Sequence, residues 1–121
     1  MVGNYLNEMK TITIATDFSD TPLGRYPDDG AYNGEAFREN FLVPALRDSP
    51  DGVKVVMDGV EGFGSSFLDE AFGGLVRNCG FEKAFLKARL HLQASPENLL
   101  YVNLIWKYID RAKPSQSTRA S

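Results

Sequence analysis

The sequence predicts one α/β domain built around a mainly parallel sheet. Three short stretches, near residues 11–15, 53–57 and 88–92, have the composition of strands, and stretches with helical spacing separate or follow them. Strands that alternate with helices form βα units, whose right-handed crossovers place the strands side by side and parallel. A length of 121 residues suits one domain with a single core.

The first predicted strand leads into a long connection. Residues 11–15 alternate polar and apolar side chains, which indicates a strand with one buried face. Residues 16–33 are rich in Asp, Pro and Gly, and the Pro-Asp-Asp-Gly run at 27–30 is typical of a tight turn. Connections of this length are uncommon in compact domains. This one therefore either contains a short strand or has a function, and the sequence leaves both open.

A helix and a buried strand come next. Asn33 is a suitable N-cap for a helix that begins at Gly34, and Pro44, which lacks a backbone N–H, is expected to kink or end it. The apolar face of this helix consists of Ala36, Phe37, Phe41, Leu42 and Ala45. Residues 53–57 are almost continuously apolar, which predicts a central parallel strand that is covered on both faces.

A glycine-containing turn at 58–64 joins that strand to a second helix. The apolar positions of this helix recur at helical spacing and are Leu68, Ala71, Phe72, Leu75, Val76 and Cys79. Ser66 is the expected N-cap, with Asp69 three residues later as its capping-box partner. Gly73 and Gly74 each cost a helix about 1 kcal/mol relative to Ala. They indicate close approach by another backbone or by a partner, or else tight packing of this helix on the sheet of the same chain.

The last third of the chain predicts a strand and a helix. Residues 81–87 fit either a helical turn or the entry to a strand. In that strand Ala88, Leu90 and Leu92 share one side, and Arg89 and His91 lie on the other. Ser95-Pro96 favours a helix start, Pro114 ends the helix, and residues 115–121 are expected to be disordered. The apolar stripe of this helix is Leu99, Val102, Ile105, Trp106 and Ile109.

Composition and charge argue against several classes of protein. A net charge of −3 and a pI near 5.1 are opposed to a nucleic-acid surface, which needs clustered Lys and Arg. No apolar run is long enough to span a membrane, and residues 1–10 lack the pattern of a signal peptide, so we expect a cytoplasmic protein. Cys79 and His91 are the only residues of their kinds and cannot form a transition-metal site. We expect no cofactor.

The stretch from Val53 to Val76 resembles the STAS domain of bacterial anti-sigma-factor antagonists. In that pattern a buried strand leads through an acidic, glycine-containing turn to a helix that begins with serine. The resemblance is strongest to the STAS-like subfamily of unknown function, in which a Ser-Phe-x-Asp-Glu-x-Phe-Gly run opens the helix, as at residues 66–73. Residues 24–26, Gly-Arg-Tyr, and residues 33–38 are similar to earlier motifs of the same subfamily.

This resemblance implies a particular architecture. It covers roughly residues 10–112 and implies an open, mainly parallel or mixed sheet of about four strands with about three to four helices. The STAS-like domain would span residues 10–113. An N-terminal segment, 1–9, would precede it and a disordered tail, 114–121, would follow it.

The resemblance also implies a partner and a switch. In antagonists of the STAS family, a serine at this helix start is phosphorylated by an ATPase-fold kinase that is also the binding partner. By position that serine is Ser65, with Ser66 beside it as a second phosphorylation candidate. A protein partner, such as a histidine-kinase-like ATPase, is therefore expected to dock on residues 62–72.

The candidate binding surface combines this helix start with nearby charged residues. Its members are Asp58, Gly62, Phe63, Gly64, Phe67, Asp69 and Arg25. Asp58 follows the central strand at its carboxyl end, where open α/β sheets form ligand sites, although turn capping is its more ordinary role. We expect at least one of Phe63 and Phe67 to be exposed. An exposed apolar side chain at this position would mark an interface.

These observations favour a regulatory binding module over an enzyme. The sequence shows no nucleophile–base pair and no set of metal ligands. The alternative is a small-ligand sensor that binds a nucleotide or another metabolite at the carboxyl ends of the strands. The oligomeric state stays open, and either a strand edge or the final helix could pair two chains.

Overall fold

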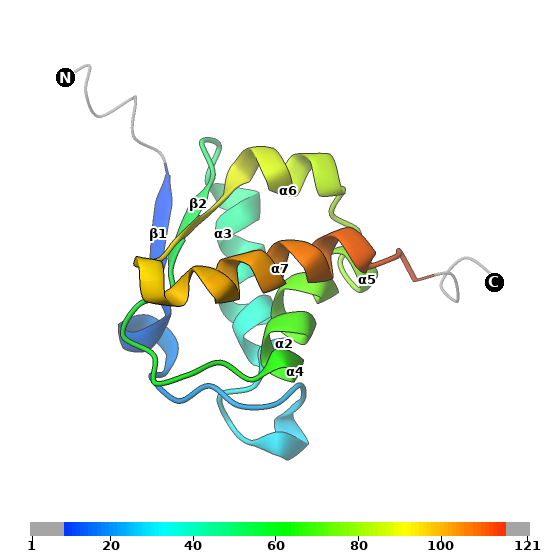
Figure 1. Cartoon of the computed structure of the whole chain (residues 1–121). Helices are drawn as coiled ribbons and strands as arrows, with labels where there is room; N and C mark the ends of the chain where they lie inside the picture. The colour runs from blue at the N-terminus through cyan, green and yellow to red at the C-terminus, as the bar shows by residue number, and fades with distance from the viewer. Residues whose placement is uncertain (1–8, 116–121) are drawn as a thin grey trace.

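The computed structural model describes residues 9–115 and folds them around a three-stranded parallel sheet (Figure 1). The strands are β1 (Lys10–Thr13), β2 (Val53–Val56) and β3 (Leu90–Gln93), and β2 lies at the centre. The predicted α/β class with a mainly parallel sheet is confirmed. The count of about four strands is not confirmed, because residues 9–115 contain three. The predictions for residues 1–8 and 116–121 fall outside the described part of the chain.

Two of the helices are continuous segments that contain a π-helical turn. Residues 34–48 form α2 (Gly34–Phe37), a π-turn (Arg38–Leu42) and α3 (Val43–Asp48). Residues 65–77 form α4 (Ser65–Leu68), a π-turn (Asp69–Gly73) and α5 (Gly74–Arg77). The remaining helices are α6 (Lys83–Arg89) and α7 (Leu99–Arg111), and a 3₁₀ turn (Pro96–Asn98) precedes α7.

The start of the first helix and its proline follow from local chemistry. Asn33 is the N-cap, as predicted, and its Oδ1 accepts a hydrogen bond from the backbone N–H of Ala36 at 2.8 Å. The helix does not end at Pro44 but continues to Asp48. The π-turn before the proline shifts the hydrogen-bond pattern, so that Pro44 falls in the first turn of α3, where its missing N–H costs little.

The long connection between β1 and α2 contains no strand in the described residues. It begins with a π-helical turn (Ile14–Phe18) and later forms a 3₁₀ turn (Pro27–Asp29). A hydrogen bond from the Leu23 N–H to the Tyr32 carbonyl at 2.9 Å closes the loop on itself. The hidden strand that the sequence allowed is therefore not formed.

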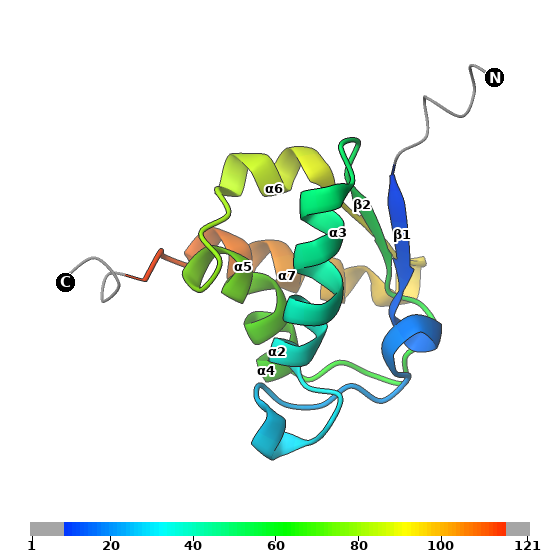
Figure 2. The ribbon, with the colours of Figure 1, turned by 180° about the vertical axis from the view of Figure 1, so that it is seen from behind.

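The helices cover one side of the sheet. Both views show the sheet at one side of the molecule with the helices gathered against a single face (Figures 1 and 2). Ile12, Val53 and Val55 point into that covered face and are at most 1% exposed, whereas Lys54 and Val56 stay partly exposed. The prediction that the central strand is covered on both faces is therefore wrong. The open face carries polar neighbours in register with Lys54, namely Thr11 and His91.

The core is filled by aromatic and aliphatic side chains between the helices and the sheet. Phe37, Phe67 and Phe72 are fully buried, and the Phe37 and Phe67 rings lie 5.9 Å apart. The backbones of α2 and α4 approach closely, since a Cβ on Gly34 would lie 2.8 Å from the carbonyl oxygen of Phe67. This contact joins residues 33–38 to residues 66–73, two of the stretches that carry the family resemblance.

In the last third of the chain, residues 83–89 are helical and the strand begins only at Leu90. The placement of Ala88 and Arg89 in the strand is therefore wrong, while Leu90 does face the core and His91 is exposed. The segment after α7 is not free at its start, because the Ser115 N–H donates to the Arg77 carbonyl at 3.1 Å. None of the helices within residues 9–115 is long and apolar enough to cross a membrane.

Candidate functional site

The helix start at residues 64–66 lies at the carboxyl end of the sheet and is open to solvent. Gly64 is the N-cap, with extended backbone angles of φ −78° and ψ 147°, and Ser65 is the first helical residue. Ser65 is exposed and Ser66 is half-buried. No side chain caps this end of the helix. Free N–H groups and the positive end of the helix dipole therefore lie next to an accessible hydroxyl.

The predicted capping box is not formed. Because the helix begins two residues earlier than expected, Ser66 lies inside the first turn instead of at the N-cap. Asp69 does not turn back to the helix start either, since its carboxylate binds Arg25 at 2.8 Å and Arg77 at 3.2 Å. The Asp69 carboxylate therefore forms ion pairs with two arginines and makes no capping hydrogen bond to the backbone at the helix start.

The bend before the helix places the other predicted residues at different depths. Gly62 and Gly64 are exposed, and Phe63 is half-buried with its ring edge-to-face on Tyr101 at 5.0 Å between centroids. Phe67 is completely buried. A direct contact between Phe67 and a partner is therefore ruled out in this structure, and Phe63 is the aromatic residue of the pair that reaches the surface.

The loop of residues 16–33 lies beside this bend, as the candidate surface requires. The Glu61 N–H donates to the Asp20 carbonyl at 3.1 Å, which joins the loop to the bend (Figure 1). Further along the loop, the Asp29 carboxylate accepts hydrogen bonds from the N–H groups of Arg25 and Tyr26. This local cap fixes the backbone of Arg25, whose side chain then reaches helix α4–α5.

Asp58 has a structural role at the end of β2. Its carboxylate accepts hydrogen bonds from the Ser95 N–H at 3.0 Å and from Asn98 Nδ2 at 2.6 Å. The hydrogen bond from Asn98, followed by those from Ser95, lowers the pKa of the Asp58 carboxyl below its ordinary value. The carboxylate thus ties the carboxyl end of the central strand to the turn that begins α7, which is the turn-capping role.

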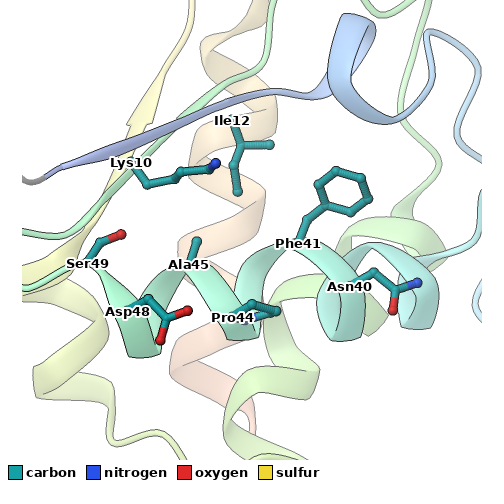
Figure 3. A pocket seen from close by; sticks show the side chains of 8 residues that line it. All are labelled: Lys10, Ile12, Asn40, Phe41, Pro44, Ala45, Asp48 and Ser49. Atoms are coloured by element: carbon teal, nitrogen blue, oxygen red, sulfur yellow. The ribbon is translucent and has the colours of Figure 1, made fainter.

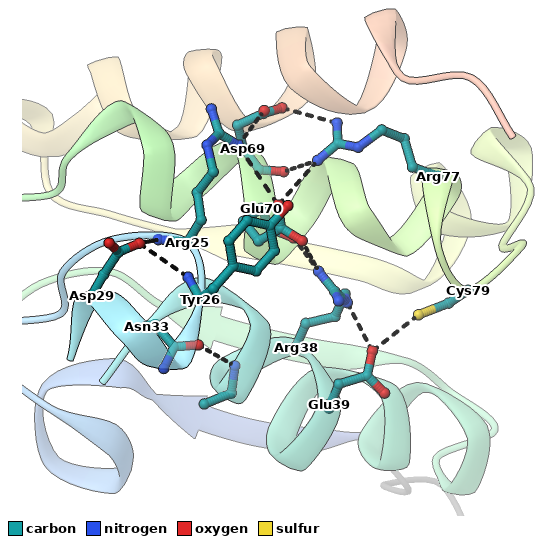
Figure 4. Close-up of polar contacts among 11 residues, drawn as sticks. Arg25, Tyr26, Asp29, Asn33, Arg38, Glu39, Asp69, Glu70, Arg77 and Cys79 are labelled. Atoms are coloured by element: carbon teal, nitrogen blue, oxygen red, sulfur yellow. Dashed lines mark hydrogen bonds and ion pairs between the residues drawn. The ribbon is translucent and has the colours of Figure 1, made fainter. Parts of the chain in front are cut away.

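A network of ion pairs links this loop to the helices (Figure 4). At its centre Glu70 and Arg38 are only 3% and 4% exposed, and Glu70 Oε2 lies 2.8 Å from Arg38 Nη1. Arg25 Nη1 and Arg77 Nη2 lie 3.7 and 3.8 Å from Glu70 Oε1. The network therefore connects the loop to the helix of residues 34–48 and to the middle and the end of the helix of residues 65–77.

The two mid-helix glycines make room for this network. A Cβ on Gly74 would overlap the Arg38 guanidinium, and one on Gly73 would lie 2.8 Å from Arg77 Nη1. Both glycines are buried. Both glycines are closely approached, but the approaching groups are the Arg38 and Arg77 side chains of the same chain and not another backbone, a partner or the sheet.

Three members of the network were not identified from the sequence, namely Arg38, Glu70 and Arg77. Charged residues on helices are usually solvated, so their types alone gave no indication. The Gly73-Gly74 pair was the available evidence, because glycines that cost helix stability mark a neighbour that needs space. Arg25 and Asp69, which the sequence did place in the site, meet each other at the edge of this network.

Asp69 gives the domain a predicted pH dependence. Burial alone would raise the pKa of Asp69, but the hydrogen bonds from Arg25 and Arg77 outweigh it and hold that pKa below its ordinary value. A lowered folded pKa contributes stability that is complete above the unfolded value near 3.9 and is lost as the pH falls through the folded value. We expect Asp69→Asn to flatten the loss of stability between about pH 5 and pH 2.

The measurement is the urea midpoint of both proteins over that pH range. Asp29, Asp58 and Glu39 also have lowered pKa values and remain in the variant, so a reduced slope is expected instead of a flat one. Equal slopes for the two proteins would show that the arginine contacts of Asp69 do not stabilise the folded state.

A shallow groove lies away from the helix start, between β1 and the α2–α3 helix (Figure 3). Its volume is about 320 Å³, and its walls are formed by Lys10, Ile12, Asn40, Phe41, Pro44, Ala45, Asp48 and Ser49. It shares no residue with the predicted binding set. Within residues 9–115 no group of three or more His, Cys, Asp or Glu side chains is arranged to hold a metal ion.

The fold and the helix start together define a class of domain. A small parallel sheet is covered on one face by helices, and a glycine bend after the central strand leads to an exposed, serine-bearing helix start. The model of a family described as a STAS-like domain of unknown function (DUF4325) matches residues 33–98, and the chain belongs to this family. No curated protein and no solved structure matches the chain.

Proposed function

We propose that this STAS-like domain is a regulatory module that binds a protein partner through residues 62–66 and the adjacent loop. The observation that carries the proposal is the exposed Ser65 hydroxyl at the first position of an uncapped helix, beside an exposed glycine bend. The domain acts by binding and not by catalysis. Glycines let a partner approach the backbone closely, and Phe63 supplies a partly exposed aromatic contact.

The resemblance to anti-sigma-factor antagonists supports the class of partner. In those proteins a serine at this helix start is the target of an ATPase-fold kinase that also binds the domain. A histidine-kinase-like ATPase is therefore the partner we propose, with Ser65 as the modified residue. A phosphate there would add nearly two negative charges at the centre of the docking surface, enough to disrupt a complementary interface.

The test combines phosphate mapping with binding measurements. The protein is incubated with a candidate ATPase and ATP, and the phosphate is located by mass spectrometry. We expect phosphate on Ser65, and we expect Ser65→Glu to weaken partner binding at least about tenfold. Because Ser65 is exposed, the same change should alter the free energy of unfolding by no more than about 0.5 kcal/mol.

Ser66→Ala is the matched control, since Ser66 adjoins Ser65 but is half-buried. This variant should keep both the phosphorylation and the binding. Two results together would refute the proposed phosphorylation switch at Ser65. No phosphate would be found at either serine, and Ser65→Ala and Ser65→Glu would bind the ATPase as tightly as the unchanged protein does.

A further inference from the structure

The first two turns of α7 are more apolar than their burial explains. Seven of the eight residues from Leu99 to Trp106 are apolar, and Asn103 is the exception. A helix that is apolar all round is normally buried on all sides. Here Ile105 is completely buried, whereas Leu99 is 48% exposed and Leu100 is 64% exposed. α7 lies across the front of the molecule in Figure 1, with its length open to the viewer.

The outer face of α7 carries an ordered stripe. Its residues within α7, spaced by four, three and four positions, are Leu100, Leu104, Lys107 and Arg111, and its fifth member, Glu97, lies three positions before Leu100 in the 3₁₀ turn that leads into the helix. Residues with this spacing lie on one side of a helix. The opposite side carries the fully buried Ile105 and Ile109. Leu104 is half-buried, and the other four members of the stripe are exposed.

The stripe has an apolar centre and oppositely charged ends. Glu97 stands at the amino end, and Lys107 and Arg111 stand at the carboxyl end. A surface of this kind is complementary to itself when two copies run antiparallel. With the two-fold axis at the level of Val102, each Leu100 meets Leu104 of a second copy, and each Glu97 meets Lys107 of a second copy.

We propose that two copies of this chain associate through α7 in this antiparallel register. The 3–4 spacing of the stripe is the spacing at which paired helices interlock. A two-fold interface uses the same patch on both subunits, so its charges must be self-complementary, and those of the stripe are. Because each copy offers one short helix face, the dimer is weak and forms at high protein concentration.

Sedimentation velocity between about 10 and 500 µM tests the association, a range that suits a small interface. We expect the unchanged protein to shift from monomer to dimer as its concentration rises. Leu100→Asp should weaken the dimer at least about tenfold, because the interface would bury a charge without a partner. Leu23→Asp is the matched control, since Leu23 is 63% exposed in the 16–33 loop, and it should leave the dimer unchanged.

Charge reversal tests the register. Glu97→Lys and Lys107→Glu should each weaken the dimer, and the double variant should restore it to within about threefold, because it re-forms both pairs with opposite signs. Circular dichroism confirms that each variant is folded. A protein that stays monomeric up to about 500 µM overturns the proposal, and so does a dimer that Leu100→Asp leaves intact. A dimer that the double reversal does not restore refutes the antiparallel register.

Discussion

Replacing Arg38 with Met is expected to destabilise the domain by about 3 kcal/mol. Arg38 and Glu70 are almost fully buried and lie 2.8 Å apart, so that removal of the guanidinium leaves a carboxylate inside the protein without its main partner. This loss is at the lower end of the range expected when one partner of a buried ion pair is removed. Arg25 and Arg77, at 3.7 and 3.8 Å from Glu70 Oε1, still offset part of the remaining negative charge. Urea unfolding monitored by circular dichroism measures the loss.

The exposed pair Lys87–Asp110 provides the comparison. Its side chains are 57% and 53% exposed, and the two charged groups lie 3.2 Å apart. Lys87→Met removes a charge of the same sign with the same replacement, yet the expected loss is between about 0 and 1 kcal/mol, because water screens the remaining carboxylate. A similar loss for both variants would mean that burial does not govern the energy of the Arg38–Glu70 pair.

A second comparison separates the energy of the Arg38–Glu70 ion pair from the packing energy of each side chain. Removing both charges, as in the double variant Arg38→Met with Glu70→Met, leaves no unpaired charge in the core. The double variant should therefore be more stable than the sum of the two single losses predicts. If the losses simply add, each residue contributes through its own packing and the ion pair itself contributes little.

The sequence predicted those features that depend on neighbouring residues. The N-cap at Asn33, the central strand near residues 53–56 and the helix after the glycine bend all follow from local spacing and turn chemistry. Each of these depends on a few consecutive side chains, which is the information that a single sequence carries directly. Ser65 was singled out by the family resemblance instead, since local capping chemistry placed the helix start two residues later than the structure does.

The features that were missed depend on contacts between distant parts of the chain. Asp69 left the predicted capping box because Arg25, 44 residues earlier, competes for its carboxylate. Arg38 and Glu70, 32 residues apart, meet inside the core. The uncovered face of the sheet was also missed, because the near-continuous apolar run at residues 53–57 does not reveal how many helices pack on each side.

Phe67 provides the second large effect that we predict. The sequence placed it on the docking surface, but its ring is fully buried and packs against the rings of Phe37 and Phe63. Phe67→Ala should therefore destabilise the domain by about 3–5 kcal/mol, since it removes a buried ring and leaves a cavity. Thermal and urea unfolding measure the change, and Phe67→Leu, which keeps most of the apolar volume, should cost less.

Phe63→Ala is the matched control, because Phe63 is an aromatic residue of the same bend but is only half-buried. Its loss of stability should be clearly smaller than that of Phe67→Ala, at about 1–2 kcal/mol for part of a ring and one edge-to-face contact with Tyr101. Under conditions where both variants are folded, Phe63→Ala should weaken partner binding more than Phe67→Leu does. The reverse order would mean that the Phe67 ring reaches the partner and that the helix start opens when it binds.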